Sequence, residues 1–217
     1  MTEPAPPFPQ IGIIVGLASE AKLARRLTPN VLCSGGRPDV AARQALDLIN
    51  AGATTLMSFG IAGGLSPTLR PGSRIVATEV ITEFDRYPAL DSSAKVIKAH
   101  TGAIYSSWSI VSTRQEKTEI LARTGALAVD MESGPVARVA QENGVKFIAL
   151  RTIADPAAHG LPPAALLALS PTGQPRILAV LWSVLKNPTQ IPALIRTARE
   201  TGKALKSLRR AVRRLSR

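Results

Sequence analysis

The sequence predicts one α/β domain with a central mixed, mainly parallel sheet flanked by helices, followed by a C-terminal amphipathic helix. A chain of 217 residues is long enough for one well-buried core and short for two complete domains. Its 45% apolar and 19% charged residues are typical of a folded chain and not of a disordered one. Short β-branched runs alternate with segments of helical spacing, which favours strand–helix units and a covered, mainly parallel sheet.

The elements before residue 90 follow from apolar runs and the residues that end them. Residues 11–17 form an uninterrupted buried-strand pattern, and 19–27 have helical spacing. Residues 39–50 form the next helix, with apolar side chains on one side. Gly52 ends this helix before the strand 54–59, and a Pro-Gly turn precedes the strand 74–82.

The second half of the chain repeats the alternation and then changes character. The predicted elements are a helix at 116–123, a strand at 126–130, a helix at 132–142 and a strand at 145–153. After Asp155, proline–glycine loops surround the apolar segment 164–169, and a short helix at 177–186 precedes the long final helix. We therefore divide the chain into an extended or disordered N-terminus (1–10), the α/β domain (11–194) and a basic amphipathic helix (195–217).

The cysteine count and the apolar segments indicate in which cellular compartment the protein is expected. One cysteine, Cys33, excludes an internal disulfide and a zinc-finger ligand set, which fits a reducing compartment. The N-terminus is acidic and proline-rich and lacks the basic start of a secretory signal. The longest apolar stretch, 177–185, is about half of what a membrane span needs. We expect a cytoplasmic protein without a metal or organic cofactor.

The net charge of +12 is concentrated in the final helix. Residues 195–217 contain nine Lys or Arg and one acidic residue, a charge of +8 that leaves +4 for the other 194 residues. This basic face is either solvated, or attracted to an anionic membrane surface at the inner side of the membrane. Binding of nucleic acid is not expected, because aromatic residues are not interleaved with the basic ones.

Carboxylates follow three of the predicted strands. Glu20 comes after the first strand, Glu132 after the strand 126–130, and Asp155 at the end of 145–153; a glycine-rich turn at 58–65 follows another. Each feature alone is more often structural, as a helix cap or a turn. Ligands of α/β folds bind at the carboxyl ends of the strands, so together these residues indicate a binding site.

The motifs at these strand ends resemble those of the purine nucleoside phosphorylase and methylthioadenosine/S-adenosylhomocysteine nucleosidase superfamily. The resemblance covers about residues 11–157 and is carried by Ala-Val-Asp-Met-Glu-Ser (128–133), Arg-Thr-Ile-Ala-Asp (151–155), the glycine turn and residues 12–23. It implies a phosphorylase/hydrolase-like fold and cleavage of the bond between adenine and ribose. In this resemblance Asp155 is the general acid, Glu132 and Met131 bind ribose, and Glu20 activates water.

Two departures from the family pattern concern the nucleophile. Ile61 follows the first glycine of the turn, where many members have serine, and Ala154 precedes the aspartate, where serine is again common. Both changes favour hydrolysis over phosphorolysis, although inorganic phosphate stays open as a co-substrate. Arg37, in a Ser-Gly-Gly-Arg-Pro turn, is a candidate anion ligand. The remaining candidates are Gly16 and Gly60 at the anion or water site, and Ser112 and Thr113 near the base.

The pattern is most similar to the hopanoid-associated phosphorylase branch of this superfamily. That branch implies release of adenine from adenosylhopane, and a lipid-linked substrate would account for an apolar segment beside a basic helix. The alternatives are a soluble nucleosidase for methylthioadenosine or S-adenosylhomocysteine, a purine nucleoside phosphorylase, and a nucleotide-binding module without catalysis. Relatives imply a homodimer.

Overall fold

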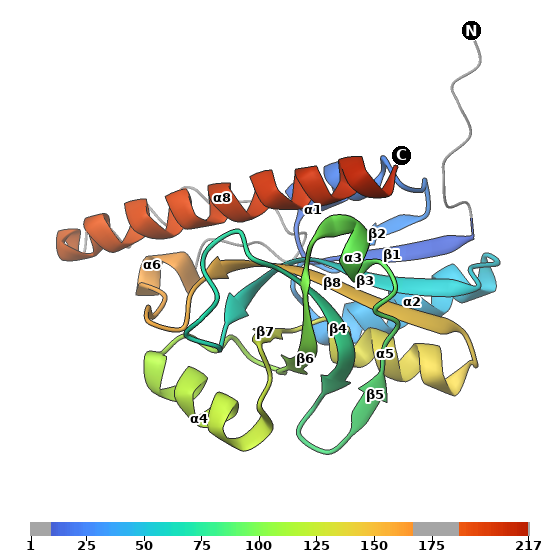
Figure 1. Cartoon of the computed structure of the whole chain (residues 1–217), viewed down its shortest axis with the longest axis horizontal. Coiled ribbons are helices and arrows are strands. Elements are labelled where there is room, and N and C mark those ends of the chain that lie inside the picture. Colours follow the sequence, from blue (N-terminus) through green and yellow to red (C-terminus); the bar gives the residue numbers. More distant parts are fainter. Residues whose placement is uncertain (1–9, 167–186, 217) are drawn as a thin grey trace, which may run out of the picture.

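The computed structural model describes residues 10–166 and 187–216. Helices cover both faces of a central sheet, and the C-terminal helix runs along one side of the molecule (Figure 1). The strands are β1 (Ile11–Val15), β2 (Val31–Cys33), β3 (Thr55–Gly64), β4 (Arg74–Ile81), β5 (Arg86–Pro88), β6 (His100–Ser106), β7 (Ala128–Asp130) and β8 (Lys146–Asp155). The helices are α1 (Ala18–Ala24), α2 (Pro38–Asn50), α3 (Ala94–Ile97), α4 (Arg114–Thr124), α5 (Ser133–Glu142), α6 (Pro163–Leu166), the 3-10 turn η1 (Pro188–Gln190) and α8 (Ile191–Leu215).

This architecture confirms the predicted fold class. The five predicted strands and four of the predicted helices each correspond to an observed element, with ends that differ by a few residues. The final helix starts at Ile191, four residues before the predicted boundary. The predicted helix 177–186, the segment 167–169 and residues 1–9 lie outside the described residues.

Within the described residues, eight strands form one mixed sheet. The strand order is β2-β1-β3-β7-β6-β4-β5, and β8 pairs with both β3 and β4. The pairs β3–β8, β8–β4, β4–β6, β6–β7 and β7–β3 therefore form a closed circuit of five strands. Strands β3 and β8 run parallel over their whole length, which places their carboxyl ends side by side.

A β-bulge near the end of β8 determines where Asp155 lies. Ala62 pairs with Ile153, but the next residue, Gly63, pairs with Asp155, so Ala154 is the extra residue. A bulge of this kind turns the strand and redirects the following side chain. Here it sets Asp155 directly beside Gly63 at the end of the sheet.

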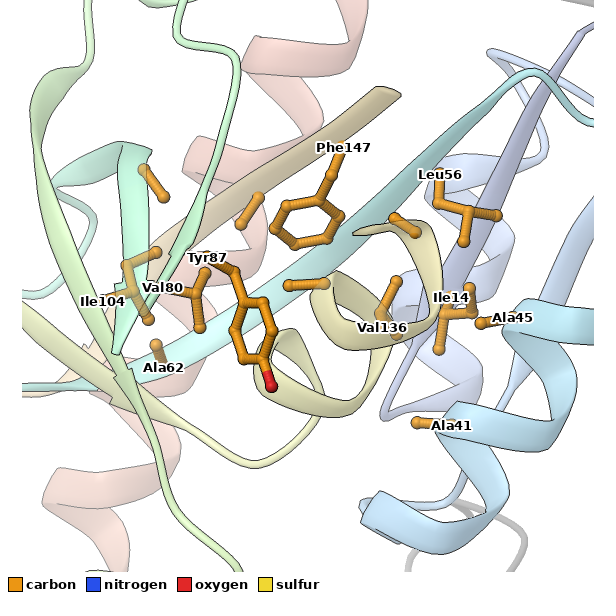
Figure 2. Packing of buried hydrophobic residues seen from close by; sticks show 14 of the residues in the cluster. Ile14, Ala41, Ala45, Leu56, Ala62, Val80, Tyr87, Ile104, Val136 and Phe147 are labelled. Carbon is orange, nitrogen blue, oxygen red and sulfur yellow. The ribbon is translucent and has the colours of Figure 1, made fainter. Parts of the chain in front are cut away.

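Alternating side chains of the strands bury two separate hydrophobic layers. Ile14 and Leu56 pack with Phe147 against α2 and α5, which contribute small residues such as Ala45 and larger ones such as Val136 (Figure 2). The neighbouring strand residues face the opposite layer, formed by α1, α3 and α8. This period of two along each strand is the reason why a central sheet has two covered faces.

Helix α8 is an integral part of the fold. Leu208, Ala211 and Val212 are buried against strand residues such as Val76 and Leu150, in the same layer as α1 and α3. Most polar residues of α8 lie on the opposite, outer side, whereas Glu200 and Ser207 are buried. In the described parts of the chain, 10–166 and 187–216, no helix has both the length and the hydropathy needed to cross a membrane.

Candidate active site

A cavity of about 420 Å³ opens at the carboxyl ends of β1, β3, β7 and β8. Glu20, Glu132 and Asp155 all line it, so the structure brings together the three carboxylates that the sequence singled out. Most of the remaining side chains around the cavity are apolar: Leu17, Ile61, Ile110, Val111, Val129, Met131 and Leu161. An apolar cavity with a few converging polar groups is typical of a small-molecule site.

Glu20 is held by backbone N–H groups from two strand ends. Its Oε2 accepts hydrogen bonds from Gly16 N (3.0 Å) and Leu17 N (2.8 Å), and its Oε1 accepts one from Ile61 N (2.7 Å). The side chain is almost fully buried. Burial raises the pKa of Glu20, opposed by the Arg151 guanidinium and by these three N–H donors. Ile61 thus contributes to the site through its backbone N–H. The sequence analysis considered only its side chain and did not predict this contact.

A buried arginine organises Glu132. Arg151, on β8, is fully buried, and its Nη2 donates to Ser58 Oγ (2.6 Å) and to Glu132 Oε2 (3.3 Å). The same guanidinium forms an ion pair with Asp130, whose carboxylate also accepts hydrogen bonds from Ser133 at the start of α5. This network fixes the end of β7 and aims Glu132 into the cavity.

Burial raises the pKa of Glu132 to about 7. The Arg151 guanidinium counteracts burial, while the nearby carboxylates of Asp130 and Glu20 add to the increase. Glu132 therefore changes its protonation state close to neutral pH. Groups with such shifts concentrate at functional sites.

Two glycines allow the carboxylates to approach the backbone. A Cβ atom at Gly60 would lie 2.5 Å from Glu20 Oε1, and one at Gly16 would lie 2.6 Å from Glu132 Oε1. Both distances are too short for a carbon atom, so any side chain there displaces a carboxylate.

Asp155 forms an ion pair with a lysine that has no contact with solvent. Lys117 Nζ, on α4, lies 2.5 Å from Asp155 Oδ2 and donates to the carbonyl oxygens of Pro156 (3.0 Å) and His159 (2.9 Å). The Lys117 side chain is 1% exposed and that of Asp155 is 13% exposed. Burial raises the pKa of Asp155, and the Lys117 ammonium opposes this increase. The lysine also holds the turn after β8 in place.

The other predicted site residues lie in different positions. Met131, Gly16 and Arg37 line the cavity, and Arg37 forms an exposed ion pair with Asp39 (2.8 Å). Gly60 lies against the Glu20 carboxylate, and its lack of a side chain leaves room for Oε1. Ser112 and Thr113 do not line the cavity: Thr113 caps α4 together with Glu116, and Ser112 O accepts a hydrogen bond from Leu161 N. The three residues before them line the cavity instead: Ser109, Ile110 and Val111.

Sequence reasoning assigned no role to Lys117 or Arg151, although both carry a signal. Arg151 interrupts the most apolar predicted strand, and a charge in a buried strand requires an acidic partner. Lys117 precedes Ile120 and Leu121 by three and four positions, so it lies on the apolar face of its helix. Among the residues that the structure describes, no group of three or more His, Cys, Asp or Glu side chains is placed to hold a metal ion.

Comparison with known proteins shows similarity to nucleosidases and a nucleoside phosphorylase over part of the chain. The model of the phosphorylase superfamily matches residues 87–186, which include Glu132, Lys117 and Asp155. A methylthioadenosine/S-adenosylhomocysteine nucleosidase of Baumannia cicadellinicola is 32% identical over 55% of this chain and 64% of its own length. One of Thermotoga maritima is 49% identical over a quarter of each chain, and a DeoD-type purine nucleoside phosphorylase of Roseobacter denitrificans is 28% identical over 57% of this chain and 49% of its own. Over about half of its length, the chain is therefore similar to members of the phosphorylase superfamily.

Solved structures confirm the fold. A mutant nucleosidase of Helicobacter pylori, with 5'-methylthioadenosine in its active site, superposes with a TM-score of 0.65 over 94% of this chain and 98% of its own, at 18% identity. An S-adenosylhomocysteine nucleosidase of Streptococcus pyogenes has a TM-score of 0.62 over 68% of this chain and 84% of its own, at 20% identity. The matches to the curated relatives span only a quarter to just under two thirds of those proteins' lengths.

Proposed function

We propose that this protein cleaves the N-glycosidic bond of an adenine nucleoside. The observation that supports this most directly is the convergence of Glu20, Glu132 and Asp155 on one largely apolar cavity. The related nucleosidases and the nucleoside phosphorylase are named for the same type of reaction.

Asp155 is suited to protonate the leaving base. When the bond between the ribose C1′ and the purine N9 breaks, its electron pair moves into the purine, which leaves more easily once N7 is protonated. The raised pKa of Asp155 favours the protonated carboxyl group that this step requires. Lys117 opposes the shift and at the same time fixes the Oδ2 atom, so it positions the acid.

Glu132 is suited to bind the ribose. A carboxylate can accept hydrogen bonds from both neighbouring ribose hydroxyl groups, and Arg151 on its other side holds the carboxylate in place. Met131 lines the same part of the cavity and supplies an apolar surface for the sugar ring. Because Glu132 titrates near pH 7, we expect nucleoside binding to weaken below neutral pH.

Water is better suited than phosphate as the nucleophile. Among the described residues that line the cavity, Arg37 is the only cationic one, and it is paired with Asp39 at the half-exposed rim. The guanidinium of Arg151 is occupied by Asp130, Glu132 and Ser58. A phosphate anion beside Glu20 would thus meet carboxylates, whereas a water molecule can donate a proton to Glu20 as its oxygen attacks C1′.

The relatives favour methylthioadenosine or S-adenosylhomocysteine as the nucleoside. A lipid-linked adenine nucleoside such as adenosylhopane is the second candidate, as the sequence pattern suggested. Ile110, which lines the cavity and is 46% exposed, offers an apolar surface to a substrate with a large apolar substituent.

The test is release of adenine, followed by chromatography, from methylthioadenosine, S-adenosylhomocysteine and detergent-dispersed adenosylhopane, each with and without phosphate. We expect phosphate-independent release that is lost in Asp155→Asn and retained in Asp47→Asn, an exposed aspartate on α2. Turnover of adenosylhopane alone would assign the second candidate. No release from any of the three substrates, or full activity of Asp155→Asn, would refute the proposal.

A further inference from the structure

The outer face of α8 carries a continuous row of positive charges. Seven of its Lys and Arg side chains are exposed, and six follow one another at alternating steps of three and four residues: Arg196, Arg199, Lys203, Lys206, Arg210 and Arg213. This spacing places them along one side of a helix. Figure 1 shows α8 along one edge of the molecule.

Within residues 10–166 and 187–216, these charges lack an acidic partner. In the described residues, none of the basic side chains of α8 forms an ion pair with an acidic side chain. The one acidic residue of α8, Glu200, is buried on the inner side, where it contacts His159 Nδ1 at 3.2 Å. Like charges three and four residues apart on a helix destabilise it slightly, so the row persists against its own repulsion.

A second segment adds to the same surface. The turn before β4 packs against α8, since a Cβ at Gly72 would lie 3.6 Å from Lys203 O. Arg74, the first residue of β4, follows this turn. Its pKa is lowered by burial and by the neighbouring Arg214 and Arg210 guanidinium groups. Arg74 Nε and Arg214 Nη1 are buried without a hydrogen-bond partner. The clustered guanidinium groups of Arg74, Arg210 and Arg214 therefore add positive charge beside the row.

We propose that the outer face of α8, together with Arg74, binds the surface of an anionic phospholipid bilayer. The row from Arg196 to Arg213 is straight and spans about 26 Å at 1.5 Å per residue, a shape that fits a plane of phosphate and carboxylate headgroups. Two exposed isoleucines, Ile191 (41%) and Ile195 (47%), stand at its N-terminal end and can enter the interface between headgroups and lipid chains.

Nucleic acid fits this face less well. Helix α8 lies lengthwise on the protein body and cannot enter a groove, and its described residues include no aromatic side chain on which bases could stack. No residue of this face lines the cavity, so the inference goes beyond the proposed function and does not depend on it.

The test is co-sedimentation of the full chain with vesicles of phosphatidylcholine alone and with 30% phosphatidylserine. Binding is compared for the natural protein and the variant Lys203→Gln/Lys206→Gln/Arg210→Gln. The matched control, Arg43→Gln/Arg138→Gln/Lys146→Gln, removes the same charge from exposed positions on the α2–α5 side and at the start of β8. Far-UV circular dichroism melting of each variant verifies that it is folded.

We expect binding only to the anionic vesicles. Each basic residue near such a surface contributes about fivefold to the partition coefficient, so the α8 variant should bind about a hundredfold more weakly. The control variant should lose less than tenfold. Equal losses in both variants, or no difference between the two vesicle types, would overturn the proposal. Tight binding of duplex DNA by a protein that ignores the anionic vesicles would overturn it as well.

Discussion

Replacing Lys117 with methionine tests the most unusual contact of the candidate site. Methionine keeps the length and apolar stem of the side chain but removes the ammonium, leaving Asp155 and two carbonyl oxygens without their donor. Removal of one partner of a buried ion pair costs about 3–5 kcal/mol. Without the ammonium the pKa of Asp155 rises further, so protonation of Asp155 relieves part of this cost at low pH.

Urea denaturation followed by far-UV circular dichroism measures this cost. We expect Lys117→Met to lose about 3–5 kcal/mol of unfolding free energy at pH 8 and clearly less at pH 5. The double variant Lys117→Met/Asp155→Asn should be more stable than the sum of the two single losses predicts, because it leaves no uncompensated charge. Additive losses that are equal at both pH values would show that Lys117 acts only through packing and that the ion pair has no energetic significance.

Three further variants probe the site and the fold. Glu132 has a native pKa of about 7 against 4.5 in the unfolded chain, so its stabilising contribution is complete below pH 4.5 and disappears as pH rises through 7. Between pH 5 and 8 the natural protein should lose about 2.5 kcal/mol relative to Glu132→Gln in urea denaturation, and parallel profiles would refute the shift. Gly60→Ala places a carbon atom 2.5 Å from Glu20 Oε1 and therefore displaces this carboxylate. We expect kcat/KM for adenine release to fall at least tenfold, roughly the effect of a misplaced catalytic group. Gly202→Ala, in open space on α8, is the control and should leave kcat/KM unchanged. Leu208→Ala should lower the unfolding free energy by about 2–5 kcal/mol, and a loss below 1 kcal/mol would show that α8 is not part of the core.

The sequence predicted the elements whose buried faces have a regular period and missed those without one. Strand β6 was not predicted, because the residues of its first half, His100, Thr101 and Gly102, are polar or small. Only Ile104 to Ser106 of this strand are buried. Strand β2 has three residues, too few to show alternation. Both strands exist because neighbouring strands pair with them, and this information lies elsewhere in the chain.

The site could be predicted as a set of residues but not as a network. Carboxyl ends of the parallel strands β1, β3 and β8 meet at one edge, which accounts for Glu20 and Asp155 lying close together. Glu132 follows β7, which runs antiparallel to β3, so its place in the cavity does not follow from that argument. Spacing along the chain does not show that Ile61 supplies a backbone N–H or that Lys117, 38 residues before Asp155, reaches it. Such contacts depend on how a helix and a strand from distant segments pack, which a single sequence does not specify.

The closed circuit of strands has a consequence for how the chain folds. Strand β8 occupies the gap between β3 and β4, which precede it by more than 60 residues, so the circuit closes only after most of the chain has been synthesised. Until then, the 10-residue β3 presents unpaired backbone groups, which are a template for association with other chains. In the finished fold the strands at the two ends of the order, β2 and β5, have only three residues each, so little edge remains exposed. Fragments that end before Lys146 should therefore aggregate, and completion of β8 is the step that protects the nascent protein from doing so.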